Sequence, residues 1–410
     1  MILGPGLITG ASDDDPSGIG TYTQAGASLG FATLWTAPVT LPMMAAVQFI
    51  CAKIGMVSGM GLGGVLRKYY PRWVVYTAIS LLVIANTINA GTDIGAIAAA
   101  INLLVPIPAL ALVVPIALGI VALQIFGSYK LISKIFKWLT LTLFGYILAA
   151  FLARPHWGEV LKATLIPTIH IDHVYLMTLV AILGTTISPY LFFWQASQEV
   201  EEELNMGRAT LTEREGATDR EIRFAEIDVD VGMVFASLVF YFVILASAAT
   251  LHAAGKTDIQ TATEAAEALG PLAGGGATIL FALGLIGCGF LAVPVLTGSS
   301  AYAIGEACGW NCGLNERLRG APRFYAIIAA STLVGMLINF LKIPPVKALF
   351  WTAVINGVLA PPLLVMIMLI ANNPKVMGHR VNGRLTNFIG WSTAAIMAAA
   401  ALGMFLTWGK

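Results

Sequence analysis

Charge is what this sequence has least of. Asp, Glu, Lys and Arg make up 11% of its 410 residues, whereas hydrophobic residues make up 58%. A soluble domain carries about 25% charged residues, so this shortage excludes an ordinary soluble protein. The net charge of +1 says nothing about partners, but the chain carries no nucleic-acid-binding motif. We therefore predict a membrane protein without a nucleic-acid partner.

Cysteine is also scarce. Cys51, Cys288, Cys308 and Cys312 fall mostly within or at the ends of apolar segments, and the Cys308 and Cys312 pair has no histidine beside it. We interpret all four as packing thiols rather than as a metal or redox pair. The sequence also lacks a His-rich zinc motif, a nucleophile elbow and a Gly-rich phosphate loop. These absences argue against a membrane-embedded enzyme and predict no cofactor.

Long apolar segments are what the chain has in abundance. We find eleven that are long enough to cross a bilayer, which takes about 20 helical residues. None alternates like a barrel strand, so we predict an all-α polytopic membrane protein forming a single transmembrane domain, 1–410. The predicted spans are 4–29 (broken), 32–55, 74–103, 108–126, 131–153, 174–204 (broken), 227–252, 276–308, 322–341, 346–371 and 385–408.

The basic residues predict an orientation. With the N-terminus in the cytoplasm, 17 of the 23 Lys and Arg residues fall on the cytoplasmic side and 6 on the outer side. Cytoplasmic loops of membrane proteins carry such an excess. No cleavable signal peptide is apparent, because the first apolar stretch already contains acidic residues. We expect a protein of the prokaryotic plasma membrane, with its N-terminus inside and its C-terminus outside.

Two of the predicted spans are interrupted. The first contains Asp13-Asp14-Asp15-Pro16, and the sixth contains Gly184-Thr185-Thr186-Ile187-Ser188-Pro189-Tyr190. A proline releases the carbonyl four residues before it, here that of Ser12 and that of Thr185. Carboxylates at membrane depth are costly and mark functional sites. A broken helix beside a carboxylate therefore predicts a cation site.

The two breaks stand at corresponding places in two halves of the chain. Pro16 and Pro189 are 173 residues apart, each in the first helix of a block of five. Paired interruptions of this kind are typical of transporters built from inverted repeats. We predict one repeat over about 1–154, a second over about 174–371, and an accessory eleventh helix over about 385–408.

Several motifs, taken together, resemble those of Nramp-type divalent metal transporters. The resemblance covers nearly the whole chain, and it implies a LeuT-type 5+5 inverted repeat of about 11 transmembrane helices with helices 1 and 6 discontinuous. The matching motifs are Gly4-Pro5-Gly6, Asp15-Pro16-Ser17-Gly18, Gln24-Ala25-Gly26-Ala27, Ala52-Lys53-Ile54-Gly55-Met56-Val57-Ser58-Gly59, Tyr70-Pro71-Arg72-Trp73, Thr92-Asp93, Met377-Gly378-His379-Arg380-Val381-Asn382, Leu385-Thr386 and Gly390-Trp391.

The departures from the family pattern concern the metal ligands. Gly18 stands where the family has Asn, and Ser188-Pro189-Tyr190 stands where it has Met-Pro-His. Gln195 replaces a second His, and Ala96 replaces a Glu, although the nearby Asp93 is kept. Sulfur selects softer ions, whereas oxygen-only sites suit Mg²⁺, Ca²⁺ and Mn²⁺. The chain is thus most similar to the Nramp-related magnesium transporter subgroup.

We predict an oxygen-lined site with one anionic ligand, Asp15, and the freed carbonyls as neutral ligands. Because Gly18 and Ser188 are small, we expect a widened cavity and a partly hydrated ion, Mg²⁺ or also Mn²⁺. The predicted metal site comprises Asp15, Gly18, Ser12, Thr185, Ser188, Ser17 and Thr186. The predicted pathway comprises Asp13, Asp14, Asp93, Tyr190, Gln195 and Asn356.

The missing histidines and the missing Glu also affect the proton coupling that we expect. Histidine is the side chain most easily recruited for proton relay near neutral pH. We therefore expect little or no proton coupling, with transport driven by the membrane potential. The expected partners are the ion and the lipid bilayer, with no obligate protein partner.

Two other transport functions remain open, as do the roles of several acidic residues. The chain could be a proton-coupled Mn²⁺/Fe²⁺ importer or a sodium-coupled symporter of an organic substrate, although the three Asp residues disfavour an anionic substrate. Asp13 and Asp14 are expected on other faces of the helix than Asp15, lining the aqueous path or binding the ion or its waters. We expect a solvated helix end for Glu199 to Glu203, and a surface position for Glu306.

Overall fold

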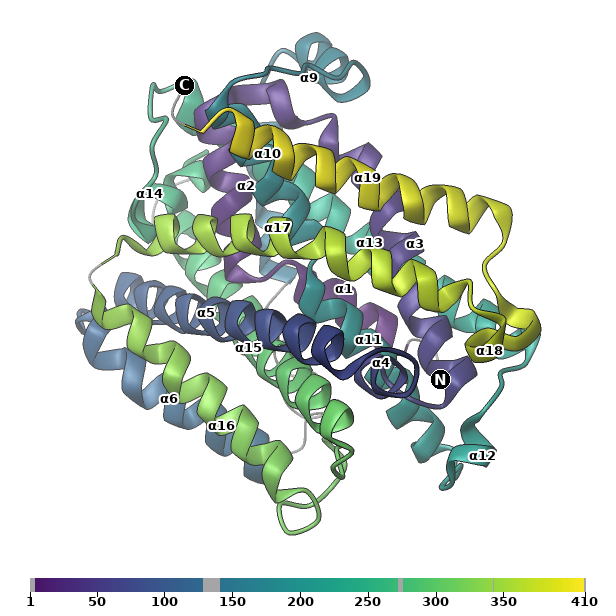
Figure 1. Ribbon diagram of the computed structural model, residues 1–410. Coiled ribbons are helices and arrows are strands. Elements are labelled where there is room, and N and C mark those ends of the chain that lie inside the picture. The colour runs from purple at the N-terminus through teal and green to yellow at the C-terminus, as the bar shows by residue number, and fades with distance from the viewer. Residues whose placement is uncertain (1–3, 128–140, 272–275, 342, 409–410) are drawn as a thin grey trace.

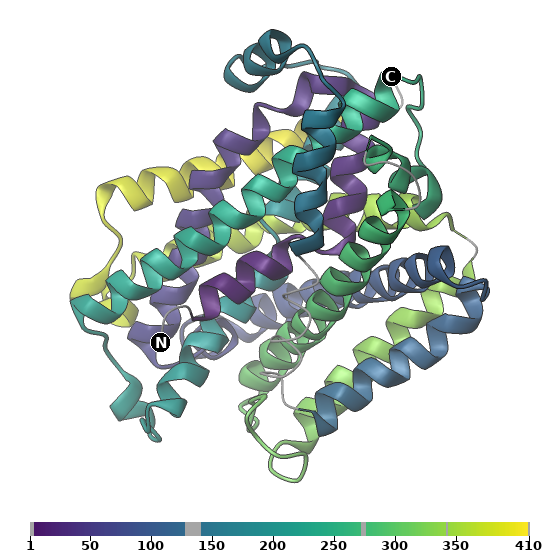
Figure 2. The same cartoon turned by 180° about the vertical axis from the view of Figure 1, so that it is seen from behind.

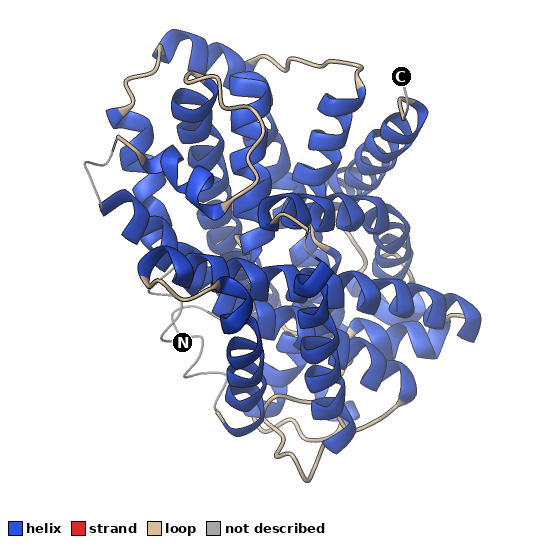
Figure 3. Cartoon of the chain, turned by 90° about the vertical axis from the view of Figure 1, so that its left-hand side faces the viewer, coloured by secondary structure: helices blue, strands red, loops and turns tan. Residues whose placement is uncertain are grey.

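The computed structural model describes residues 4–127, 141–271, 276–341 and 343–408 (Figure 1). In these ranges every regular element is helical, as Figure 3 shows. The α-helices are α1 (Pro5–Asp13), α2 (Pro16–Leu29), α3 (Thr36–Ser58), α4 (Leu62–Tyr69), α5 (Arg72–Leu104), α6 (Ala109–Phe126), α8 (Gly145–Leu152), α9 (Trp157–Leu165), α10 (His173–Thr186), α11 (Pro189–Asn205), α12 (Leu211–Arg214), α13 (Asp219–Ser247), α14 (Ala262–Ala266), α15 (Gly276–Cys308), α16 (Pro322–Met336), α17 (Pro345–Ala371), α18 (Pro374–Met377) and α19 (Arg384–Leu406). Short 3-10 segments are η1 (Gly30–Thr33), η2 (Leu141–Phe144), η4 (Glu267–Leu269), η5 (Leu337–Leu341) and η6 (Gly378–Arg380), and η3 (Ala248–His252) is a π-helical turn.

The predicted spans correspond to helices wherever the chain is described. Nine stretches of the described residues are long and apolar enough to cross a membrane. The first predicted span is split into α1 and α2, each too short to cross alone. The fifth, 131–153, begins at residues outside the described ranges, and its described part forms η2 and α8. The all-α fold class is confirmed.

Both predicted breaks exist, and each proline opens the second half-helix. Pro16 is the first residue of α2, and Pro189 is the first residue of α11. A proline fits there, because the first turn of a helix leaves its N–H groups unpaired in any case. The non-helical residues are Asp14 and Asp15 in the first break, and Ile187 and Ser188 in the second. The acidic run is therefore part of the break itself.

Glycines allow the half-helices to cross long helices at very short range. A Cβ on Gly10 would lie 2.2 Å from the carbonyl oxygen of Gly232 in α13, and one on Gly184 would lie 2.1 Å from that of Ala353 in α17. Small residues are how membrane helices approach each other closely. Figure 2 shows α1, in purple, lying along α13.

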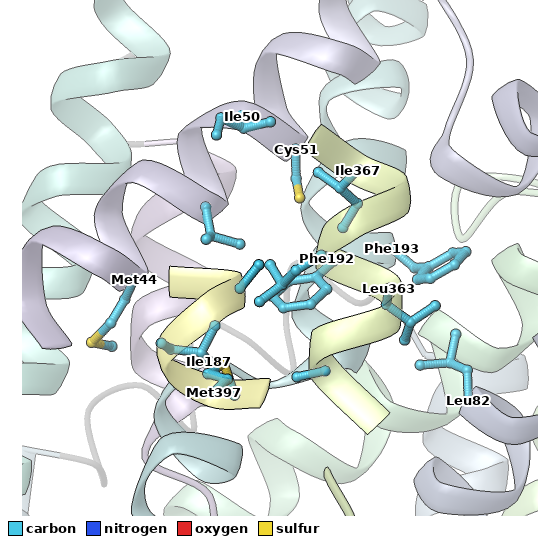
Figure 4. Packing of buried hydrophobic residues seen from close by; sticks show 14 of the residues in the cluster. Met44, Ile50, Cys51, Leu82, Ile187, Phe192, Phe193, Leu363, Ile367 and Met397 are labelled. Carbon is cyan, nitrogen blue, oxygen red and sulfur yellow. The ribbon is translucent and has the colours of Figure 1, made fainter. Parts of the chain in front are cut away.

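A buried apolar cluster fixes the second break. Ile187 lies in the break, and Phe192 and Phe193 follow it in α11; all three are at most 1% exposed. They belong to a cluster with Cys51 of α3 and Leu363 of α17, and Figure 4 shows Phe192 among these side chains. Between membrane helices such packing, rather than the hydrophobic effect, drives association. The start of α11 is thus held by several elements.

The two ends of the chain lie on opposite sides of the bundle. In Figures 1 and 2 the N end lies on the side of α12, and the C end on the side of α9. Which side faces the cytoplasm stays a prediction, and so do the boundaries of the two repeats.

Candidate ion site at the two helix breaks

Asp15 caps the half-helix that follows it. Its backbone is extended, and its Oδ1 accepts hydrogen bonds from the Gly18 N–H at 2.6 Å and from the Ser17 hydroxyl at 2.8 Å. Asp is among the preferred residues at such a position, where its charge also meets the positive end of the helix. Two of the predicted metal-site residues, Ser17 and Gly18, therefore hold Asp15 in place.

A third donor reaches Asp15 from another helix. The Asn89 side chain of α5 donates to Asp15 Oδ2 at 2.9 Å. Both carboxylate oxygens of Asp15 are thus engaged: Oδ1 accepts two hydrogen bonds, whereas Oδ2 accepts one and keeps a lone pair that could face an ion. Asn89 is not among the site residues that the sequence predicts.

The second break satisfies its own freed carbonyl. The Ser188 hydroxyl donates to the carbonyl oxygens of Thr185 at 2.8 Å and Gly184 at 3.0 Å. The Thr186 hydroxyl donates to the carbonyl of Ile182 at 2.9 Å. An ion that binds the Thr185 carbonyl would therefore share it with Ser188 or displace that hydroxyl.

Tyr190 joins the two breaks. Its hydroxyl donates to the carbonyl oxygen of Ser12 at 2.9 Å, across from α11 to α1. The backbone carbonyl of Tyr190 accepts from the Ser299 hydroxyl of α15 at 2.7 Å. The carbonyl that sequence reasoning expected Pro16 to release is thus occupied by a side chain predicted for the pathway.

The expectation of a widened cavity at Gly18 is wrong for this conformation. A Cβ on Gly18 would lie 3.1 Å from Thr185 Oγ1, 3.3 Å from Asp15 Oδ1 and 3.3 Å from the Tyr22 ring. The Thr185 side chain and the Tyr22 ring fill the space that a larger side chain would need. The two breaks meet directly at Gly18 and Thr185.

Three other acids of the predicted pathway, Asp13, Asp14 and Asp93, are buried and at most 1% exposed. Within the described ranges the carboxylates of Asp13 and Asp14 accept no hydrogen bond, whereas Asp93 lies beside the backbone N–H of Ser17. Burying an unpaired carboxylate is among the most expensive arrangements a protein can hold. These groups therefore need a proton or a cation.

A chain of polar side chains leads away from the breaks along α11. The Thr9 hydroxyl donates to Gln195 Oε1, and the Gln195 amide donates to Glu199 at 2.8 Å. Glu199 lines a pocket of about 230 Å³ together with Glu202 and Asp228. Gln195 thus lies between the first half-helix and this pocket. Asn356 of α17 is also buried, at 1% exposure.

Two expectations about acidic residues near the helix ends are wrong. Glu199, Glu201 and Glu203 are at most 7% exposed, so this end of α11 is covered rather than solvated. Glu306 is not a free surface group, because it accepts hydrogen bonds from the Ser197 hydroxyl at 2.8 Å and the Gly64 N–H at 3.3 Å. In each case a neighbouring element covers the acidic side chain. The sequence of one helix alone does not show such a contact.

Two of the four cysteines, Cys51 and Cys288, are buried, and Cys308 and Cys312 are partly exposed. All four are free. Burial, with the nearby Glu306 and Glu201, raises the pKa of Cys312 to about 12, which leaves the thiol protonated and unreactive. The thiol of Cys288 donates to the Leu285 carbonyl at 3.4 Å.

No three His, Cys, Asp or Glu side chains converge into a metal cluster among the described residues. Any ion at the breaks would thus be held with the help of carbonyl, hydroxyl and amide oxygens, or of water. A pocket of about 490 Å³ lies elsewhere, beside Tyr69, Gly216 and His379 in the loops on the N-terminal side.

The fold and the paired breaks define the class of this protein: a membrane transporter with the LeuT-type architecture. The same fold is seen in Mhp1, a nucleobase-cation-symport-1 family transporter, with a TM-score of 0.58 at 14% identity over 99% of this chain and 91% of that one. The likeness to a manganese transporter of Eremococcus coleocola is stronger, with a TM-score of 0.76 at 18% identity over 97% and 85%.

The chain belongs to the Nramp family, because the family model described as natural resistance-associated macrophage protein-like matches residues 6–407. It is similar to the divalent metal cation transporter MntH of Pectobacterium carotovorum subsp. carotovorum, at 26% identity over 99% of this chain and 93% of the relative. MntH of Klebsiella pneumoniae subsp. pneumoniae is 27% identical over 97% and 92%. The chain is accordingly an integral membrane protein and a divalent metal cation transporter of this type.

Proposed function

We propose that this protein carries Mg²⁺, and also Mn²⁺, by alternating access and without moving protons. The observation that supports this proposal is the chemistry at the breaks. The contacts at Asp15, Ser12 and Thr185 are made by carboxylate, carbonyl, hydroxyl and amide groups. Such oxygen ligands suit Mg²⁺, which keeps several waters and is usually held through one or two carboxylates.

The driving force would be the membrane potential. Moving one charge across 100 mV is worth about 2.3 kcal/mol, so a divalent ion gains about 4.6 kcal/mol. The positions of the two family histidines hold Tyr190 and Gln195, and both are engaged in hydrogen bonds within the protein. Neither titrates near neutral pH, so neither is suited to a proton relay.

We further propose that the protein lies in a prokaryotic plasma membrane with its N-terminus in the cytoplasm, and that it acts without a cofactor, a catalytic reaction or an obligate protein partner. The charge distribution of the loops supports this orientation.

A second candidate is a proton-coupled manganese importer. The buried carboxylates of Asp13, Asp14 and Asp93 favour it, because buried carboxylates can carry protons. Two of the relatives are described as divalent metal cation transporters and one solved structure as a manganese transporter.

Ion influx into proteoliposomes separates the two candidates. Purified protein is reconstituted with a Mg²⁺ dye or a pH dye inside, and a potassium diffusion potential is applied. Mg²⁺ entry that rises with the potential and leaves the lumenal pH unchanged is expected. Absence of Mg²⁺ entry, together with Mn²⁺ uptake that acidifies the lumen, would establish the second candidate instead.

A further inference from the structure

Oxygen acceptors outnumber donors around the first break. Asp13 and Asp14 contribute four carboxylate oxygens without a hydrogen bond, and Oδ1 of Asn89 is a fifth. The carboxylate of Asp93 lies nearby, beside the backbone N–H of Ser17. All four side chains are at most 1% exposed. Asp15 is the exception in the acidic run, because its two oxygens accept from Ser17, Gly18 and Asn89.

A proton would satisfy these oxygen acceptors less well than a hydrated cation would. Protonating a buried carboxylate removes its charge, but it leaves a hydroxyl that needs an acceptor and a carbonyl that still lacks a donor. A divalent cation with its water shell supplies positive charge and several O–H donors at once. The unpaired acceptor oxygens thus match the positive charge and the O–H donors of a hydrated cation.

The position of Asp13 connects these unpaired oxygen acceptors with the hydrogen-bonded side chains of Thr9, Gln195 and Glu199. Residues four apart lie on one face of a helix, so Asp13 shares a face of α1 with Thr9. Thr9 donates to Gln195 and therefore faces α11. Asp13, Asp14 and Asp15 are also all at most 1% exposed. The acidic run surrounds one end of the break rather than pointing into lipid.

We propose that Asp13 and Asp14 bind the transported divalent cation through its water ligands, as a carboxylate pair on the N-terminal side of the break. In this arrangement Asp15 also acts as a positioning residue, since it orders the first turn of α2. The inference rests on the proposed function only in that the chain carries a divalent cation. It holds for Mg²⁺ and for Mn²⁺ alike.

The test compares Asp13→Asn with Asp14→Asn, the double variant and Asp15→Asn, using MgCl2 and MnCl2. Thermal unfolding of the purified protein is measured without and with each ion, beside transport in proteoliposomes. An ion that binds only the folded state raises its melting temperature. The double variant is expected to melt at or above the wild-type temperature without ion, because two partnerless carboxylates are gone. It should lose the ion-induced rise and show at least a tenfold higher KM.

Asp15→Asn should behave in the opposite way and melt at a lower temperature without ion, because it weakens a helix cap. Asp258→Asn, in an exposed loop, is the matched control and should leave both readouts unchanged. A double variant that keeps the ion-induced rise and the wild-type KM for both ions would overturn the inference. If the double variant does not fold, the single variants and Asp13→Glu are measured in the same way.

Failure of the proposed magnesium transport would give a different result from failure of the carboxylate pair. A wild-type protein that carries Mn²⁺ but not Mg²⁺ would refute the magnesium proposal, while the carboxylate pair would still be tested with MnCl2.

Discussion

Single side chains determine how the two broken helices meet. Tyr190 donates from α11 to the Ser12 carbonyl in α1, and Ser188 covers the Thr185 carbonyl. Both hydroxyls hold carbonyls that an ion could bind. We infer that entry of an ion into the site exchanges these hydrogen bonds for ion contacts.

Tyr190→Phe tests the contact between the breaks. The substitution leaves the buried Ser12 carbonyl without its donor, which costs about 1–3 kcal/mol. A lower melting temperature in detergent is the expected result. Tyr76→Phe, at an exposed position in α5, serves as the control. An unchanged melting temperature for Tyr190→Phe would mean that water or another donor replaces the hydroxyl.

Gly18→Asn tests the space at the first break. It restores the residue type found in the family, but its Cβ would lie 3.1 Å from Thr185 Oγ1. Crowding a packed interior costs about 1–3 kcal/mol, so the variant should be less stable and less active. Adding Thr185→Ala should recover stability. Full activity of Gly18→Asn alone would show that Thr185 and Tyr22 move aside easily.

Residue patterns predicted the existence and chemistry of the breaks, but not the details of their contacts. The prolines located both interruptions, and the preference of Asp for helix caps was available in the sequence. The partner Asn89 and the filling of Gly18 by Tyr22 and Thr185 depend on side chains from other helices or other turns. No local pattern contains that information.

Among the elements, α1 and α13 cross at very short range. Gly10 and Gly232 face each other with no room for a side chain, and Asp228 of α13 accepts from the N–H groups of Gly4 at 2.7 Å and Gly6 at 2.6 Å. The first half-helix is thus attached to α13 both at its start and along its length.

Gly10→Ala should disrupt this crossing. The added Cβ would lie 2.2 Å from a backbone oxygen that no side-chain rotation can move, so we expect a loss of at least about 1–3 kcal/mol and reduced transport. Gly119→Ala in α6, where nothing lies within 4 Å, should be neutral or slightly stabilising, since Ala favours helix over Gly by about 1 kcal/mol. Equal melting temperatures for the two variants would argue that α1 separates readily from α13.

Helix spans were predictable because they depend on apolar length, which the sequence displays directly. The environment of the helix ends could not be predicted from the sequence. Glu201 is covered because Tyr302 donates to it at 2.9 Å and Asn315 at 2.7 Å. Both partners come from about 100 residues further along the chain, so the end of α11 by itself could only suggest solvent.

For the whole molecule, the position of the termini on opposite sides is consistent with the predicted topology and leaves the orientation to be measured. Cysteine labelling decides it. Thr212→Cys lies in α12 on the N-terminal side and Thr257→Cys in a loop on the opposite side; both positions are exposed. In intact cells whose Cys308 and Cys312 are replaced by Ser, a membrane-impermeant maleimide should label only the variant at 257. Labelling at 212 alone would reverse the orientation.

The attachment of α1 to α13 has a consequence for observing the transport cycle. The amide protons of Gly4 and Gly6 are held by a carboxylate on a different helix, so they can exchange with deuterium only when the two helices separate at that end. Mass spectrometry of the N-terminal peptide can follow this exchange in protein that carries no attached probe. The exchange rate would directly report how often the first half-helix opens.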